Sequence, residues 1–120
     1  MRVLIVDDQP TYREVAREVV GATPGFELVG EASSGEESLD LSRELRPDLV
    51  LMDVNLPGID GMEATRQITQ SSQPPIVFLI STYESEEYSK RAEECGAAGF
   101  IPKSDFDPDV LASSWKEAKG

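Results

Sequence analysis

The stretch LVLMD at Leu49–Asp53 is a short apolar run that ends in a carboxylate. A similar run near the start of the chain, Val3–Val6, is followed by Asp7 and Asp8. Short apolar runs bounded by polar residues are typical of strands that are buried on both faces of a parallel sheet. The sequence therefore predicts two central strands whose C-terminal ends carry three carboxylates.

Two further apolar runs are followed by polar side chains of another kind. Ile76–Ile80 is followed by Ser81, and the run at 100–101 comes shortly before Lys103. The C-terminal ends of parallel strands lie at one edge of the sheet, and open α/β sheets bind ligands there. We therefore expect the three carboxylates, Ser81 and Lys103 to converge on one site.

Helix signals alternate with these runs. Pro10 suits the first turn of a helix, because its missing N–H would be unpaired there anyway. The inner face of that helix is expected to consist of Tyr12, Val15, Ala16, Val19 and Val20. A capping box at 34–37 (SGEE) begins a second helix, and Asp60 is placed to cap a third. The inner face of the next helix is expected to consist of Tyr88, Ala92 and Cys95.

Five strand-then-helix units with short links predict an α/β fold with helices on both faces of a parallel sheet. The connection rules favour a flavodoxin-like (βα)5 three-layer sandwich with strand order 2-1-3-4-5 and a switch point between strands 1 and 3. The edge strands would be 26–32, which alternates in polarity, and 99–102, whose Pro102 cannot donate to a ladder. Residues 1–120 are expected to form one domain, with no second domain among them.

The chain is strongly acidic, with 23 Asp and Glu against 11 Lys and Arg, and a net charge of −12. This balance disfavours direct binding to nucleic acid, which requires clustered basic residues. It favours divalent cations and basic partner surfaces.

Cys95 is the one cysteine, and histidine is absent. A lone cysteine forms no internal disulfide, which favours a reducing, cytoplasmic setting. The absence of histidine excludes a histidine base, a histidine metal ligand and a Ser-His-Asp triad within this chain. We expect neither membrane binding nor a leader peptide, because no apolar stretch could span a bilayer and Met1 leads almost directly into a strand.

Three neighbouring carboxylates repel one another, and a hard divalent cation resolves the repulsion. We expect Mg²⁺, with Mn²⁺ or Ca²⁺ as substitutes, because Mg²⁺ binds one or two carboxylates and completes its shell with water and phosphate oxygens. A carboxylate can also act as a nucleophile toward a phosphoryl group. Asp53, at the end of the central strand, is the best placed to do so. Lys103 and Ser81 would then neutralise and hydrogen-bond the phosphoryl oxygens.

Four motifs follow one another along the chain: DD at 7–8, DVNLPGIDG at 53–61, ST at 81–82 and GAAGFIPK at 96–103. In this order they resemble response-regulator receiver domains, the phospho-accepting halves of two-component signalling. The resemblance implies that Asp53 is the phosphoacceptor in a phosphorelay. Its donor would be a sensor histidine kinase or a phosphotransfer protein. The implied metal ligands are Asp7, Asp8, Asp53 and the backbone carbonyl of Asn55.

The resemblance also implies a switch. Ser81 matches the hydroxyl that moves toward the phosphate, and Phe100 the aromatic that changes its burial in response. Asn55 and Tyr83 occupy positions that tune the lifetime of the aspartyl phosphate. The output would be a changed surface around strands 4 and 5 and the helix between them, near 83–88.

The form GFIPKS at 99–104 looks like that of receivers that precede a helix-turn-helix DNA-binding domain. This implies transcription regulation by the full-length protein, through its own or a separate output domain, and possible homodimerisation on phosphorylation. A stand-alone receiver that acts through protein contacts is the alternative. Many receivers have proline directly after the lysine, whereas here Ser104 follows Lys103 and Pro102 precedes it. The sequence does not determine whether the bond before Pro102 is cis or trans.

Two rival functions share parts of this pattern. A flavin-binding electron carrier has the same predicted architecture, but it needs a Ser/Thr/Gly-rich phosphate loop where this chain has DDQP at 7–10. A phosphatase that works through an aspartyl intermediate needs a second acid two residues after the nucleophile, and that position is Asn55. The receiver is thus expected to be a switch rather than a turnover enzyme.

Overall fold

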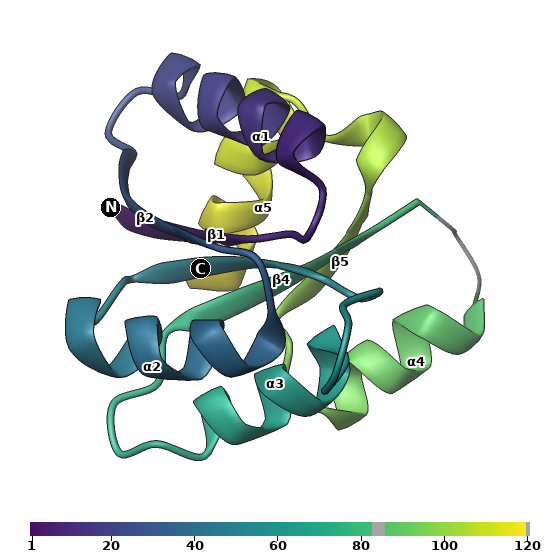
Figure 1. The fold of residues 1–120 in the computed structure, drawn as a ribbon. Helices are drawn as coiled ribbons and strands as arrows, with labels where there is room; N and C mark the ends of the chain where they lie inside the picture. Colours follow the sequence, from purple (N-terminus) through teal and green to yellow (C-terminus); the bar gives the residue numbers. More distant parts are fainter. Residues whose placement is uncertain (83–85, 120) are drawn as a thin grey trace.

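A five-stranded parallel sheet runs through the middle of the molecule (Figure 1). The computed structural model describes residues 1–82 and 86–119, without the side chains of residues 86–89. The strand order is β2-β1-β3-β4-β5, as predicted. The strands are β1 (Arg2–Val6), β2 (Glu27–Ala32), β3 (Leu49–Asp53), β4 (Ile76–Ser81) and β5 (Gly99–Pro102). Strand β2 thus begins one residue later than predicted, and β2 and β5 are the edge strands.

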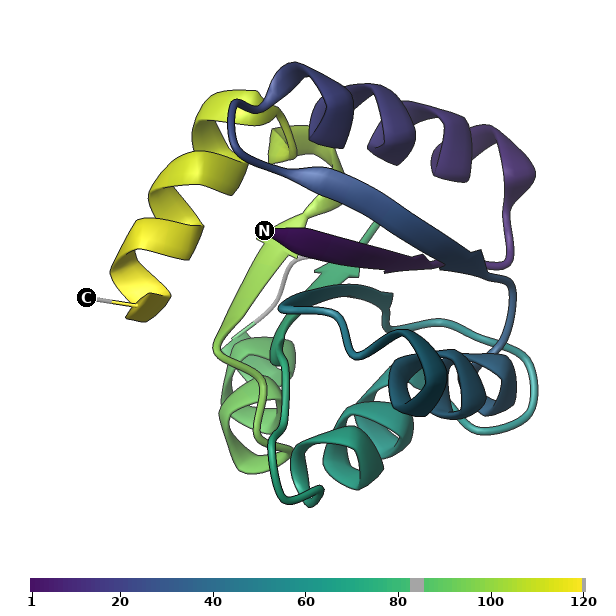
Figure 2. The same cartoon turned by 90° about the vertical axis from the view of Figure 1, so that its left-hand side faces the viewer.

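Helices cover both faces of the sheet, which gives the three layers seen in Figure 2. One layer consists of α1 (Pro10–Ala22) and α5 (Pro108–Lys119). The other consists of α2 (Gly35–Leu45), α3 (Gly61–Thr69) and α4 (Glu86–Glu94). A short 3-10 helix, η1 (Lys103–Asp105), links β5 to α5. None of the helices in the described part of the chain has the length and apolarity needed to cross a membrane.

Each strand contributes side chains to two separate cores. In β3, Val50 and Met52 join the core beneath α2, α3 and α4. Leu49 and Leu51 join the core beneath α1 and α5. Every residue of β3 is buried, which confirms that the apolar run at 49–53 is a central strand covered on both faces.

The predicted inner face of α1 is wrong at one position. Ala16, Val19 and Val20 are buried, but Val15 is 42% exposed. The buried stripe of a helix is about 100° wide, and position 15 lies beyond the border of the stripe that 16, 19 and 20 define.

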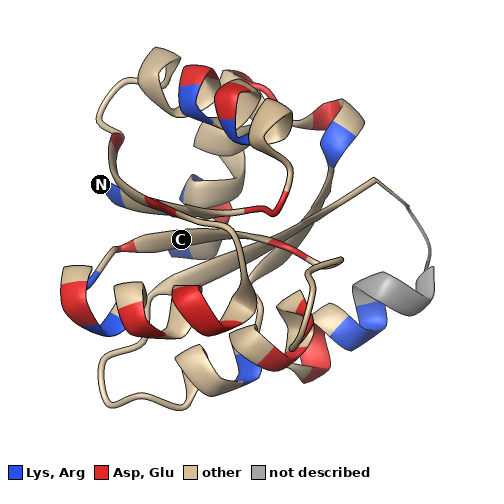
Figure 3. Ribbon diagram, viewed as in Figure 1, with Lys and Arg blue, Asp and Glu red and all other residues tan. Residues whose placement is uncertain are grey.

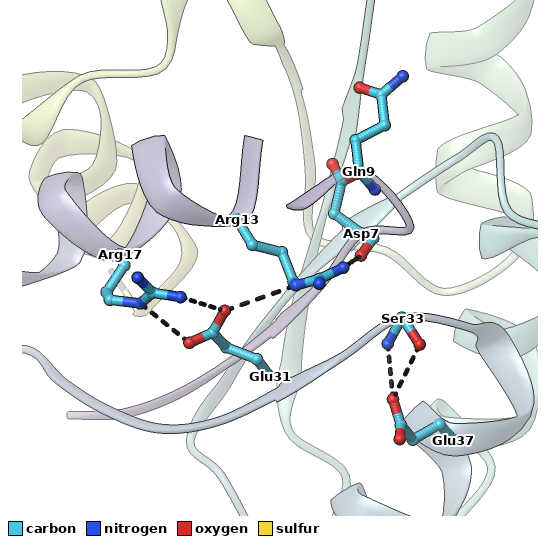
Figure 4. Close-up of polar contacts among 7 residues, drawn as sticks. All are labelled: Asp7, Gln9, Arg13, Arg17, Glu31, Ser33 and Glu37. Carbon is cyan, nitrogen blue, oxygen red and sulfur yellow. Dashed lines mark hydrogen bonds and ion pairs between the residues drawn. The ribbon is translucent and has the colours of Figure 1, made fainter. Parts of the chain in front are cut away.

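The helices α2 and α3 begin at side-chain caps. The hydroxyl of Ser34 accepts from the backbone N–H of Glu37 at 3.1 Å, and Asp60 accepts from that of Glu63 at 2.8 Å. The capping box differs from the prediction, because Glu37 accepts from the N–H of Ser33 at 2.6 Å, one residue before the cap (Figure 4). Both helices therefore start where predicted, and both start beside the C-terminal ends of strands.

Candidate functional site

Three carboxylates gather at the C-terminal ends of β1 and β3. These strands are direct neighbours, with Val6 paired to Met52, so the residues that follow them meet. Asp7, Asp8 and Asp53 each offer one oxygen, and these oxygens lie within 4.8 Å of one another. Asp7 and Asp53 are only 2% and 4% exposed, whereas Asp8 is exposed.

Hydrogen bonds from backbone N–H groups orient the two buried carboxylates in the same way. Asp7 accepts a hydrogen bond at Oδ1 from the N–H of Gln9 at 2.8 Å. Asp53 accepts at Oδ1 from the N–H of Asn55 at 3.2 Å. In each case a side chain bonds to the backbone two residues further on, which fixes its orientation. The second oxygen of each carboxylate faces Lys103, with Nζ 2.9 Å from Asp7 and 3.7 Å from Asp53.

One ammonium thus faces two of the three clustered carboxylates. Burial, then the charge of Asp7 and to a smaller extent that of Asp8, raise the pKa of Asp53 from its ordinary value of 3.8 to a net value of about 6. Lys103 and the N–H of Asn55 pull this pKa in the opposite direction. Three carboxylates against one ammonium leave the cluster with more negative charge than Lys103 compensates. Its hard oxygen donors suit a divalent cation such as Mg²⁺.

Ser81 and Phe100 lie on the strands beside this cluster. Ser81 ends β4 and is fully buried. The N–H of Val54 donates to the carbonyl of Ile80 at 3.0 Å, which places Ser81 just beyond the end of β3. Phe100 is half-buried and packs against the core beneath α2, α3 and α4. The bond before Pro102 is trans.

Two tyrosines named in the sequence predictions cannot be compared with the structure. Tyr83 lies outside the described residues, and so does the side chain of Tyr88. The predicted output surface near 83–88 therefore stays a prediction. Ala92 and Cys95, predicted on the same helix face as Tyr88, are buried.

The loop between β3 and α3 is packed closely against Asp53. The N–H of Gly61 donates to the carbonyl of Val54 at 2.9 Å. A Cβ at Gly61 would lie 2.0 Å from the backbone oxygen of Asp53, so this position requires glycine. Glu36 of α2 accepts from the N–H of Ile59 at 3.4 Å, which holds the far side of the loop. Asn55 is exposed in this loop.

Arg13 and its partners, which sequence reasoning missed, hold the turn after β1 (Figure 4). Arg13 donates to the backbone carbonyl of Asp7 at 2.7 Å. Its Nε lies 3.6 Å from Glu31 of β2, and Glu31 also accepts two hydrogen bonds of 3.0 Å from Arg17. The available signal was spacing: a helix that begins at Pro10 carries its first long side chains back over the end of β1.

Tyr12 is the other residue that sequence reasoning did not place in the site. The Nζ of Lys103 lies 4.3 Å from the centre of the Tyr12 ring. The Tyr12 hydroxyl is buried and has no hydrogen-bond partner among the described residues. Burial, followed by the charges of Asp7 and Asp53, raises the pKa of this hydroxyl above its usual value.

Comparison with known proteins places the chain in a family. A family model described as the response regulator receiver domain matches residues 3–116. The chain belongs to the response-regulator receiver family. As a receiver, it has the five-stranded order and helical layers that the resemblance implied.

Several relatives of this receiver are longer proteins. The response regulator GacA of Pseudomonas viridiflava is 43% identical over 103 residues, which are 86% of this chain and 48% of GacA. A protein-glutamate methylesterase/protein-glutamine glutaminase of Syntrophus aciditrophicus is 43% identical over 117 residues, which are 96% of this chain and 32% of that protein. The chain thus spans about half and about a third of these relatives' lengths.

A solved structure matches nearly the whole receiver. It is the signal receiver domain of the putative response regulator NarL from Mycobacterium tuberculosis, with 31% identity and a TM-score of 0.90. The match covers 99% of this chain and 96% of that one. These likenesses favour the receiver over the flavin-binding carrier and the aspartyl phosphatase.

Proposed function

We propose that this receiver accepts a phosphoryl group on Asp53 from a histidine of a sensor kinase or phosphotransfer protein. One observation carries the proposal. A buried carboxylate at the end of the central strand lies within 4.8 Å of two other acids and faces one ammonium. Such a site suits phosphoryl transfer, in which positioning and charge neutralisation do most of the work.

In the transfer step, an oxygen of Asp53 forms a bond to phosphorus while the bond from phosphorus to the donor imidazole nitrogen breaks. The electron pair of the broken bond stays on the imidazole, and the product is an aspartyl phosphate. With a pKa of about 6, Asp53 is mostly ionised at neutral pH and available as the nucleophile. Lys103, whose Nζ is 3.7 Å from the Asp53 carboxylate, would then form an ion pair with the phosphoryl oxygens, which carry the negative charge after transfer.

Asp7, Asp8, Asp53 and the backbone carbonyl of Asn55 would hold Mg²⁺, with Mn²⁺ or Ca²⁺ as substitutes. A bound cation supplies charge neutralisation for the phosphoryl oxygens. The hydrogen bonds from Gln9 to Asp7 and from Asn55 to Asp53 support this assignment, because they orient the carboxylates before any ligand binds.

Ser81 and Phe100 would convert the new charge into a changed surface. Ser81 is buried beside Asp53 and would donate to a phosphoryl oxygen, while half-buried Phe100 has room to change its burial. The changed surface is expected around β4, β5 and α4. Asn55 and Tyr83 would tune how long the phosphoryl group persists.

The receiver would act in the cytoplasm on its own or a separate output domain, with dimerisation on phosphorylation as one route. Relatives include a transcriptional regulatory protein, DegU of Brevibacillus brevis, and the methylesterase named above. We propose transcription regulation for the full-length protein. We expect no direct nucleic-acid binding by residues 1–120, because acidic residues are spread over the helices of both layers (Figure 3).

The assignment of Asp53 is tested by Mg²⁺-dependent labelling with a small acyl phosphate. The native chain and Asp60→Asn should be labelled, because asparagine preserves the cap of α3. Asp53→Asn should not be labelled. Equal labelling of Asp53→Asn and the native chain would refute the proposed acceptor.

A further inference from the structure

Lys103 is held by an aromatic ring as well as by two acids. Its side chain is only 12% exposed. Beside the carboxylates of Asp7 and Asp53, its Nζ lies 4.3 Å from the centre of the Tyr12 ring. A lysine has a long, flexible stem, so an ammonium in a nearly buried site needs partners that limit where it can go.

The three partners respond differently when the site is used. If a divalent cation engages Asp7, the closest contact of Lys103, at 2.9 Å, weakens. Phosphorylation moves the charge of Asp53 outward onto the phosphoryl oxygens. The ring of Tyr12 carries no formal charge and takes part in neither event, so its attraction for the ammonium persists through both.

We propose that Tyr12 is a positioning residue for Lys103: the face of its ring holds the ammonium beside Asp53 while the other contacts change. This inference rests on the proposed function of Asp53 and Lys103. A cation–π contact at a partly desolvated site favours the held position by about 2- to 30-fold. The loss of the ring should slow phosphoryl acceptance by a factor in that range.

The ring, rather than the hydroxyl, carries this role. The hydroxyl is buried without a hydrogen-bond partner in the described part of the molecule. Tyr12 borders a small internal space together with Asp7 and Asp53 and with apolar side chains of the core beneath α1 and α5, namely Ile5, Ala16, Leu51 and Ile80. Because an unpaired buried hydroxyl is unfavourable, its removal should leave the protein at least as stable.

The experiment compares Tyr12→Phe, which keeps the ring, with Tyr12→Leu, which removes it. Phe26→Leu is the matched control. It removes a ring from the same core, where the ring of Phe26 packs edge-to-face on Trp115 with ring centres 5.9 Å apart. Phe26 precedes β2 and Lys103 follows β5, so the two residues belong to opposite ends of the parallel sheet. The maximal rate of phosphoryl acceptance from a small acyl phosphate, the affinity for Mg²⁺ and the stability to urea are measured for each variant of the 120-residue chain. NMR records the ε-methylene protons of Lys103 in the unphosphorylated proteins.

We expect Tyr12→Leu to lower the maximal rate by about 2- to 30-fold, with Mg²⁺ affinity nearly unchanged. Tyr12→Phe and Phe26→Leu should keep the native rate. The Lys103 protons should be shifted by the ring current and inequivalent in the native chain and Tyr12→Phe, and averaged in Tyr12→Leu.

Three kinetic results would overturn the inference: a native rate in Tyr12→Leu, an equal loss in Tyr12→Phe, or an equal loss in Phe26→Leu. The NMR comparison separates this inference from the proposed function. If the native chain accepts no phosphoryl group, the proposed function fails, while the Lys103 protons still report whether the ring holds the ammonium. Equivalent, unshifted Lys103 protons in the native chain would refute the positioning role.

Discussion

Asp53 is buried against another carboxylate with one ammonium to compensate both, and this raises its pKa to about 6. In the unfolded chain the same group titrates near the ordinary value of 3.8. Between these two values the native state binds more protons than the unfolded state. The free energy of unfolding therefore falls as the pH rises through this interval, and the deficit persists at higher pH. The cluster costs stability when no cation is bound.

From this it follows that Asp53→Asn stabilises the protein at neutral pH in the presence of a chelator. A shift from 3.8 to about 6 corresponds to an upper limit of about 3 kcal/mol, so we expect a gain of about 1–3 kcal/mol near pH 8. The gain should disappear at about pH 4, where Asp53 is protonated in the native state. Urea unfolding at both pH values measures it.

The control for this prediction is Asp40→Asn, at an exposed acid of α2 that is paired only with Arg43 among the described residues. It should change the stability by less than about 0.5 kcal/mol at either pH. If Asp53→Asn were less stable than the native chain near pH 8, the ionised Asp53 carboxylate would stabilise the protein, and the prediction would be wrong.

At the scale of the elements, the site is a set of strand ends whose following turns are held by neighbouring helices. Arg13 of α1 binds the carbonyl of Asp7, and Glu36 of α2 binds the loop after β3. Gly61, the first residue of α3, lies directly against the backbone of Asp53. The geometry of the carboxylates therefore depends on how helices from both layers meet the sheet.

Gly61→Ala should disrupt the junction between β3 and α3. Its Cβ would lie 2.0 Å from the backbone oxygen of Asp53, so the backbone must shift. We expect a loss of about 2–4 kcal/mol in the free energy of unfolding, together with slower phosphoryl acceptance. Urea unfolding and the labelling assay measure the two effects.

Gly21→Ala is the matched control for Gly61→Ala. Gly21 lies within α1, and a Cβ there meets nothing within 4 Å. Alanine should raise the free energy of unfolding by about 0.5–1 kcal/mol, because it is the better helix former. If Gly61→Ala were as stable as Gly21→Ala, Gly61 would not lie as close to the backbone of Asp53 as described, and the prediction would be wrong.

Across the whole molecule, a net charge of −12 attracts cations without any specific site. The clustered carboxylates would add a specific cation site to this general field. The two contributions differ in their response to salt, because a monovalent salt screens the exposed charges and leaves a coordinated divalent cation largely in place.

Mg²⁺ should therefore stabilise the native chain at constant ionic strength. At a concentration about one hundred times its Kd, the gain in the free energy of unfolding is about 2.7 kcal/mol. Asp8→Asn should lose most of this gain, although Asp8 is exposed, while Asp40→Asn should keep it. Thermal unfolding with and without chelator measures the gain, and equal gains in both variants would indicate nonspecific attraction.

The sequence by itself determined the sheet order, the two-faced burial of β3 and the convergence of Asp7, Asp53 and Lys103 on one edge. These follow from short apolar runs, helix caps and connection rules, all of which act on neighbouring residues. The same local rules failed at Val15 and at the partner of Glu37, where a single position at the border of a pattern decides the outcome.

Only the tertiary structure decided which side chains hold the site in place. The ring of Tyr12 under Lys103, Arg13 on the carbonyl of Asp7 and Glu36 on the far loop join residues from different elements. Periodicity places a side chain on a helix face, but its reach depends on rotamers and on how the helix packs against the sheet. Those quantities arise when the layers assemble, so no pattern along the chain contains them.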